Sequence, residues 1–292
     1  MKLDKNFQPR DVAAAGSLRF DGVKAAIVGG TGGIGRALAR LLASRGASVL
    51  VVGQTFRDAG VPGIEFLQAD LSLMREAQRV ASELPAETLD VVVFTTGIFA
   101  APNRQETAEG IEKDMAVSYL SRLVIVRDIA PRLGTERPQG APKPRVFVMG
   151  FPGAGNTGTL DDLNAEKSYK AMAVHMNTVA GNEMIVLDAV NRYPQMNFFG
   201  LNPGLIKTDI RSNFLGAGSV RHRLTEWLIG HLAPSADDYA QRIAPLLVSP
   251  DLEGRSGTMF DRKGRAILPS PKLTGGHIDA FMSASRALVA VS

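Results

Sequence analysis

Short, uninterrupted runs of Val, Ile, Leu and Phe recur along the chain, and longer stretches with an apolar residue at every third or fourth position separate them. Uninterrupted apolar runs of this length are typical of strands buried on both faces of a parallel sheet, whereas the wider spacing is typical of amphipathic helices. We predict strands over residues 24–28, 48–52, 65–68, 91–94, 145–149, 197–200 and 258–260.

Helices are predicted between these strands, over residues 34–45, 74–83, 107–133, 168–190 and 235–248. This alternation predicts an α/β fold: a Rossmann-type, doubly wound parallel sheet of about seven strands with helices on both faces. No repeat or linker divides the chain, so we expect residues 1–292 to form a single domain with an N-terminal extension over residues 1–20. In such sheets ligands bind at the carboxyl ends of the strands, and functional residues are expected directly after each strand.

A glycine-rich loop directly follows the first predicted strand. Its sequence, Gly29-Gly-Thr-Gly-Gly-Ile-Gly35, leads at once into a predicted helix. Glycines let the backbone turn tightly and approach a phosphate, and a helix N-terminus offers unpaired N–H groups and a partial positive charge. We therefore predict a cradle for the pyrophosphate of a dinucleotide, with contacts from Gly29, Thr31, Gly33, Ile34 and Gly35.

Composition narrows the range of functions. The chain has 292 residues, a formal net charge of +4 and no cysteine. So small a charge does not indicate nucleic-acid binding, and the lack of cysteine excludes disulfides and thiolate chemistry. His222 and His231 have no paired acids or cysteines near them, so we expect no metal site. No stretch approaches the ~20 apolar residues of a membrane span, and residues 1–11 lack the apolar core of a signal peptide. We expect a cytoplasmic protein.

The spacing Gly29-x3-Gly33-x-Gly35 resembles the cofactor loop of the short-chain dehydrogenase/reductase family, and the resemblance extends over roughly residues 20–271. Residues 162–169 and 257–260 further resemble its retinol dehydrogenase and WW-domain oxidoreductase branch. The resemblance implies an enzyme that binds NAD or NADP and moves a hydride between this cofactor and a carbonyl or alcohol compound.

The resemblance also implies cofactor contacts after later strands. The family contacts adenine at the positions of Asp70 and Leu71, and it has its Asn-Asn-Ala-Gly motif at the positions of Thr96 and Gly97. It holds the nicotinamide carboxamide at the positions of Pro203, Gly204, Ile206 and Thr208.

The residues after the second strand favour NADP over NAD. An acidic residue there would bind the ribose hydroxyls of NAD and repel a 2′-phosphate, but the first acid in this segment is Asp58. Gln54 can hydrogen-bond a ribose or a phosphate, and Arg57 or Arg36 can supply a positive charge.

The catalytic positions of the family are all changed. The family uses an Asn in the helix after the fourth strand, a Ser after the fifth strand, and a Tyr and a Lys one helical turn apart. Ser118 stands at the Asn position and Phe151 at the Ser position, and no Tyr in the chain has a Lys four residues later.

Two registers are open for the Tyr and Lys positions. Counting from Tyr169 puts His175 at the Tyr position and Val179 at the Lys position, and this register keeps three matching residues. The other register puts Val174 and Thr178 there. We favour the first.

His175 is the candidate acid/base, because an imidazole exchanges protons near neutral pH without a helper lysine. A cation beside an imidazole would disfavour its protonated form, which fits the loss of the Lys. The alternative is that His175 merely packs on its helix. Ser118 and Tyr169 are the further catalytic candidates.

Three functions fit these residues. The first, which we favour, is an NADP-dependent oxidoreductase that acts on a small carbonyl or alcohol compound through a non-standard proton donor. The others are a non-redox enzyme, for cyclisation, isomerisation or dehydration, and an inert dinucleotide-binding protein. A lid over about 207–236 is expected to select the substrate. The helices over 107–133 and 168–190 are the family's usual packing surface, through which a homodimer could form.

Overall fold

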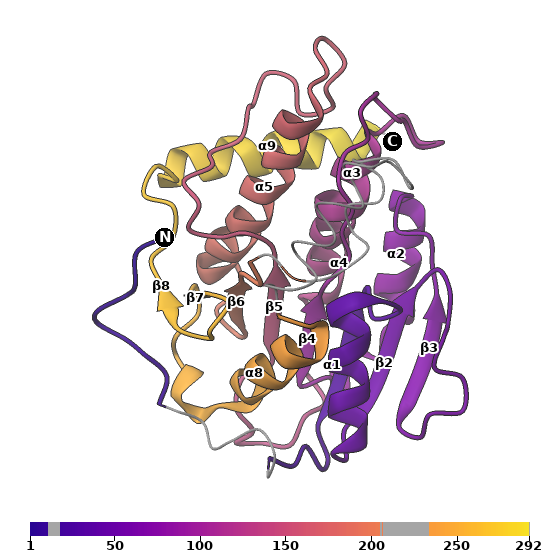
Figure 1. Ribbon diagram of the computed structural model, residues 1–292, viewed down its shortest axis with the longest axis vertical. Helices are drawn as coiled ribbons and strands as arrows, with labels where there is room; N and C mark the ends of the chain where they lie inside the picture. The colour runs from indigo at the N-terminus through magenta and orange to yellow at the C-terminus, as the bar shows by residue number, and fades with distance from the viewer. Residues whose placement is uncertain (11–17, 205, 207–233, 292) are drawn as a thin grey trace.

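The computed structural model describes residues 1–10, 18–204, 206 and 234–291. Its centre is an eight-stranded sheet with the order β3-β2-β1-β4-β5-β6-β7-β8 (Figure 1). Neighbouring strands from β3 to β7 pair in parallel, and β8 pairs antiparallel with β7. The strands are β1 (Lys24–Val28), β2 (Ser48–Gly53), β3 (Ile64–Gln68), β4 (Val91–Phe94), β5 (Arg145–Met149), β6 (Asn197–Leu201), β7 (Met259–Phe260) and β8 (Ala266–Ile267).

The predicted fold class is confirmed, and each predicted strand is present to within one residue at either end. The prediction missed β8, whose two residues are too few to give an apolar pattern. Beside β8 lies part of the expected N-terminal extension, where Leu3 pairs with Ile267.

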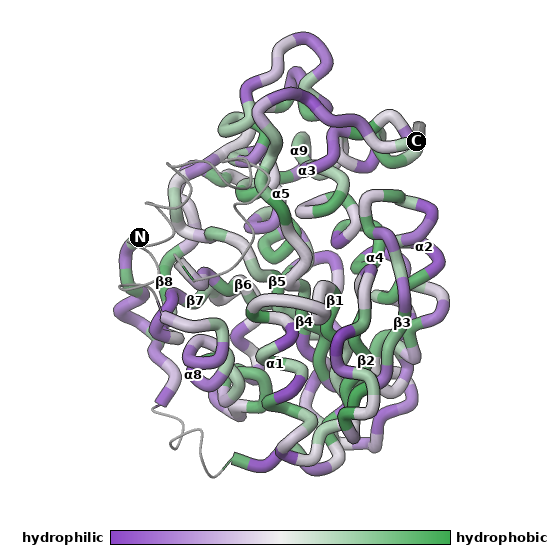
Figure 2. The backbone as a smooth tube through the Cα atoms, turned by 45° about the vertical axis from the view of Figure 1, so that its right-hand side comes forward, coloured by the Kyte–Doolittle hydropathy of each residue, from purple (hydrophilic) through white to green (hydrophobic). Residues whose placement is uncertain are grey.

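Helices cover both faces of the sheet. On one face α1 (Gly33–Ser44) packs against α8 (Ala236–Val248). On the other face lie α2 (Met74–Glu83), α4 (Ser121–Ile129) and α5 (Ala171–Arg192). Figure 2 shows the hydrophobic positions concentrated along the strands and the hydrophilic ones along the outer turns. Short 3-10 helices, η1 (Ala86–Thr88) and η4 (Pro250–Leu252), lie in the connections.

The helix predicted over 107–133 is shorter than expected and is not regular. It consists of α3 (Lys113–Met115), a π-helical turn η2 (Ala116–Leu120) and α4. The preceding residues form a turn closed by Thr107 and Ile111, and the Glu112 carboxylate caps the helix by accepting from the Met115 nitrogen. Such π turns are frequent at functional sites, and Ser118 lies in this one.

A C-terminal helix, α9 (Gly275–Val291), was not predicted. It lies across α5 (Figure 1), and its Ser285 hydroxyl lies 2.8 Å from the Tyr119 hydroxyl. Residues 121–126 of α4 and 177–186 of α5 are all buried within the single chain. The surface predicted for a homodimer is therefore largely covered by the chain itself.

The expected lid lies outside the described residues except for 234–236. Among the described residues, no helix is long and apolar enough to cross a bilayer.

Candidate active site

The glycine-rich loop runs from β1 to α1 and packs against the segment that follows β4. A Cβ atom at Gly29 would lie 2.4 Å from the Thr96 nitrogen, and one at Gly35 would lie 2.5 Å from the Gly29 oxygen. Gly29 also has a φ of +94°, a region that favours glycine. Both positions require glycine, because a side chain would push the loop away from the end of β4.

The start of α1 fits the phosphates of a dinucleotide. Gly32 is the N-cap residue, and no side chain caps this helix. A Cβ atom at Gly32 would meet nothing within 4 Å, so this side of the loop is open. The neighbouring Thr96 hydroxyl is buried without a hydrogen-bond partner among the described residues. An uncapped helix N-terminus offers N–H donors to an anion, and a buried unpaired hydroxyl indicates that a polar group belongs beside it.

The remaining predicted cofactor contacts follow strands β3, β4 and β6. Leu71 and Ile206 are buried, whereas Gly97, Pro203 and Gly204 are partly exposed. Thr208 lies outside the described residues.

Of the residues that would distinguish NADP from NAD, Gln54 and Arg57 follow β2, whereas Arg36 lies on α1. The Gln54 amide donates a hydrogen bond to Asp70 at 2.9 Å. Arg36 donates to both carboxylate oxygens of the buried Asp58, and this pairing lowers the pKa of Asp58. Arg57 is exposed and makes no hydrogen bond or ion pair with any other described residue. Of the two arginines, Arg57 is the one available to a phosphate.

Hydrogen bonds join His175, Asp114 and Ser118. Nδ1 of His175, on α5, lies 2.8 Å from Oδ2 of Asp114, on α3. The other carboxylate oxygen of Asp114 accepts from the Ser118 hydroxyl, whose oxygen accepts in turn from the Ile98 nitrogen at 3.0 Å. The Asp114 side chain is fully buried, and that of His175 is 15% exposed. A buried carboxylate thus links an accessible imidazole to the backbone that follows β4.

The imidazole of His175 lies at the carboxyl end of the sheet. Its ring stacks on Phe99, which follows β4, with 4.1 Å between the ring centroids and 23° between the planes. Nε2 of His175 has no hydrogen-bond partner among the described residues. This nitrogen is therefore available to a ligand.

A second buried cluster centres on Arg122, on α4. Its guanidinium donates to the carbonyl oxygens of Thr96 and Met149, and to the Asn182 side chain at 2.9 Å. The Asn182 amide donates to the Ser118 carbonyl oxygen at 2.8 Å. Burial lowers the pKa of Arg122, although the charge of Asp114 opposes this effect. The cluster ties the ends of β4 and β5 to the same two helices that carry His175 and Ser118.

The other predicted positions do not join this cluster. The Tyr169 hydroxyl donates to the Ala101 carbonyl oxygen, and burial raises its pKa to about 12. Phe151 is exposed, whereas Val179 is buried. In the alternative register Val174 and Thr178 are both buried, and the Thr178 hydroxyl donates to the His175 carbonyl oxygen.

Comparison with known proteins identifies the family. The family model for short chain dehydrogenases matches residues 24–141. An uncharacterized oxidoreductase of Saccharomyces cerevisiae is 54% identical over 274 residues, which cover 92% of this chain and 89% of the yeast protein. The chain belongs to the short-chain dehydrogenase/reductase family.

More distant members show how far the likeness extends. Human polyprenol dehydrogenase is 24% identical over 257 residues, which cover 80% of this chain and 74% of the human protein. A crystal structure of an uncharacterized protein from Mycobacterium paratuberculosis superimposes with a TM-score of 0.70 at 20% identity, over 95% of this chain and 97% of that one. A short-chain dehydrogenase/reductase from Serratia marcescens gives 0.60 at 18% identity, over 84% and 97%. At these identities the structures show the shared fold.

Sequence reasoning missed two charged residues of the site, Asp114 and Arg122. Both stand in an otherwise mainly apolar stretch of helix, and Asp114 is four residues before Ser118, a spacing that puts two side chains on one helix face. A charged residue within a buried helical stretch was the available signal.

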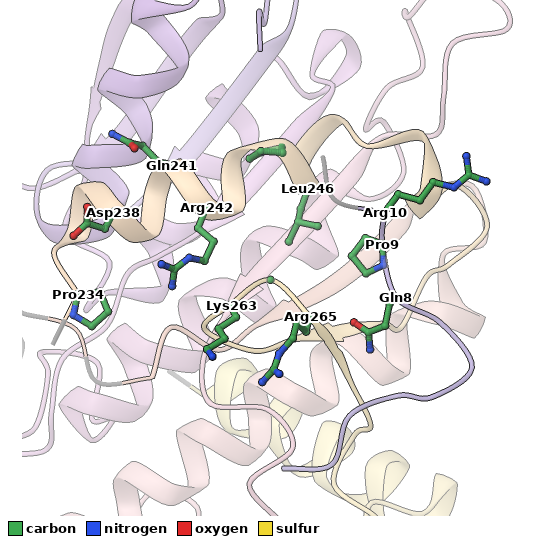
Figure 3. A pocket seen from close by; sticks show the side chains of 12 residues that line it. Gln8, Pro9, Arg10, Pro234, Asp238, Gln241, Arg242, Leu246, Lys263 and Arg265 are labelled. Carbon is green, nitrogen blue, oxygen red and sulfur yellow. The ribbon is translucent and has the colours of Figure 1, made fainter. Parts of the chain in front are cut away.

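A cavity of about 480 Å³ lies elsewhere in the protein, between α8, the turn from β7 to β8 and residues 8–10 (Figure 3). Its lining includes Arg10, Arg242, Lys263 and Arg265. No lining residue belongs to the glycine-rich loop or to the cluster around His175. No group of three or more His, Asp or Glu residues in the described part of the chain could hold a metal ion.

Proposed function

We propose that the protein is an NADP-dependent oxidoreductase that interconverts a small carbonyl compound and its alcohol, with His175 exchanging the proton at the carbonyl oxygen. Family membership supports the hydride transfer, because the oxidoreductase chemistry of this family uses a nicotinamide cofactor. We expect the enzyme to act in the cytoplasm.

The arrangement of the His175 ring carries the proposal. One ring nitrogen is bound by a buried carboxylate, the ring plane is fixed against Phe99, and the other nitrogen has no partner among the described residues. An acid or base needs a side chain that is held in place and still has one free site for proton exchange. His175 meets both requirements.

The cofactor part of the proposal rests on the loop before α1. The open, uncapped helix start would hold the phosphates, and the buried Thr96 hydroxyl would meet a polar group of the cofactor beside β4. The unpaired Arg57 and the amide of Gln54 favour a 2′-phosphate on the ribose. When bound, the nicotinamide supplies or accepts the hydride.

The protein's own part in the reaction is orientation and proton transfer. In reduction, protonated Nε2 of His175 gives its proton to the carbonyl oxygen as negative charge develops there; in oxidation, neutral Nε2 removes the proton from the alcohol. Stacking on Phe99 keeps the ring from turning, so that the same nitrogen faces the substrate in both directions.

The proposal is tested with NADPH that carries deuterium at both hydrogen positions of C4 of the nicotinamide, so that the transferred hydride is labelled whichever face of the ring reacts. Calorimetric titration should show binding of NADPH in preference to NADH, and Gly33→Val should abolish it, because Gly33 has a φ of +48° in the phosphate loop. With a panel of carbonyl compounds, mass spectrometry should find the deuterium on the alcohol carbon of the product.

Other outcomes of this experiment contradict the proposal in distinct ways. Product without deuterium indicates a non-redox enzyme, and binding without turnover across the panel indicates an inert dinucleotide-binding protein. A preference for NADH overturns the cofactor assignment, and absence of binding to every nicotinamide dinucleotide overturns the function as a whole.

A further inference from the structure

We propose that Asp114 is the positioning residue of this site: its buried carboxylate keeps a proton on Nδ1 of His175, so that the exchanged proton passes through Nε2. The inference rests on the proposed role of His175 and adds a residue from a different helix. A neutral imidazole has two tautomers, and the hydrogen bond at one nitrogen decides which of them forms.

Both oxygens of the Asp114 carboxylate are used. A carboxylate can only accept hydrogen bonds, so Nδ1 of His175 and the Ser118 hydroxyl must both be donors. The Ser118 oxygen is then free to accept from the Ile98 nitrogen. The donors thus converge on the Asp114 carboxylate, from the backbone after β4 through Ser118 on one side and from Nδ1 of the imidazole on the other, which leaves Nε2 as the site of exchange.

A fully buried carboxylate must be compensated, because burial without partners is costly for a charge. Asp114 has two hydrogen-bond donors, and the buried cation Arg122 lies near enough to interact with it electrostatically. Arg122 is in turn held by the carbonyl oxygens of Thr96 and Met149. Such an arrangement is costly to build for packing alone, which supports a role at the site.

The same contacts account for the joint loss of the family's catalytic residues. A phenol acts as an acid beside a cation, and the family supplies a Lys one turn after its Tyr. An imidazole needs an acceptor for its second N–H instead. Here Val179 is buried at the Lys position, the carboxylate comes from Asp114, and Ser118 at the Asn position donates to that carboxylate. The charged group beside the proton donor is thus a carboxylate in this protein, whereas it is a lysine in the family.

The tautomer of His175 in the wild-type protein is the first test, and it needs no substrate. The ring nitrogens can be recorded by 15N NMR at about pH 8.5, where an ordinary imidazole is neutral. The chain has four histidines, and His175→Phe identifies the signals of His175 by their loss. We expect the proton on Nδ1. A proton on Nε2 in the wild-type protein would overturn the inference, whatever any variant does.

Asp114→Asn is the second test, because an amide can donate to Nδ1 and so favour the other tautomer. We expect the Nε2–H signal of His175 to rise and turnover to fall ~10-fold or more, as loss of the correct tautomer predicts. Asp261→Asn is the matched control: Asp261 is also buried, but it accepts from the Arg265 guanidinium and lies in the β7–β8 turn. The control should leave the His175 tautomer unchanged.

The two proposals fail differently. Full turnover in His175→Phe overturns the role of His175 even when the tautomer is as expected. A tautomer that is the same in wild type and Asp114→Asn overturns the role of Asp114, even when His175→Phe is inactive.

Discussion

Gly35 shows how the fold and the proposed cofactor site depend on one residue. It lies in the first turn of α1, where alanine would ordinarily be favoured over glycine by ~1 kcal/mol. Here a Cβ atom would lie 2.4 Å from the Thr95 hydroxyl oxygen and 2.5 Å from the Gly29 carbonyl oxygen. The close approach of the loop to β4 therefore reverses the usual preference.

Gly35→Ala should lower the free energy of unfolding by ~1–3 kcal/mol, as overpacking does, and weaken NADPH binding. Urea denaturation and calorimetric titration measure the two effects. Gly276→Ala is the control, because Gly276 lies in the first turn of α9, where a Cβ atom would meet nothing within 4 Å, and its unfolding free energy should not fall below that of the wild type. Equal destabilisation by both substitutions, or stabilisation by Gly35→Ala, would contradict this explanation of the loop.

The candidate site could be predicted from sequence only where a motif marks it. The glycine spacing located the loop before α1, and the register of α5 singled out His175. The partner of His175 was out of reach, because Asp114 is 61 residues away and joins it only when α3 and α5 pack together. Pairings between distant helices leave no local pattern in one sequence.

The elements differ in how well their patterns predict them. Strands β1, β4 and β5 were predicted residue for residue, because buried parallel strands are uninterrupted apolar runs. The helix expected over 107–133 was predicted too long at both ends: its apolar pattern extends into the turn closed by Thr107, and Pro131 follows the end of α4. Helix α9 was not predicted, so the packing of α9 over α5 was not predicted either.

The burial of α4 and α5 bears on the assembly of the chain. A helix that is buried all round has no free apolar face, and this holds for residues 121–126 and 177–186 within a single copy. Helix α9 closes this side of the fold through Phe281, which is fully buried against Tyr119. Two copies could pair through α5 only if α9 moved away.

We therefore expect a monomer at micromolar concentration, contrary to the homodimer that the family resemblance allowed. Sedimentation velocity on the full chain gives the mass directly, and a species near 31.1 kDa is expected. A stable dimer with cross-links between the α5 helices of two copies would contradict this view of α9.

The central claim is that His175 exchanges the proton, and the turnover number of His175→Phe with NADPH and a reducible carbonyl compound tests it most directly. Phenylalanine keeps a ring against Phe99 and removes both nitrogens. His277→Phe is the control, because His277 lies on α9 and contacts the Thr157 carbonyl oxygen instead. We predict a kcat lower by ~10² or more for His175→Phe, with unchanged NADPH affinity and an unaffected control. A kcat equal to that of the wild type would contradict the account.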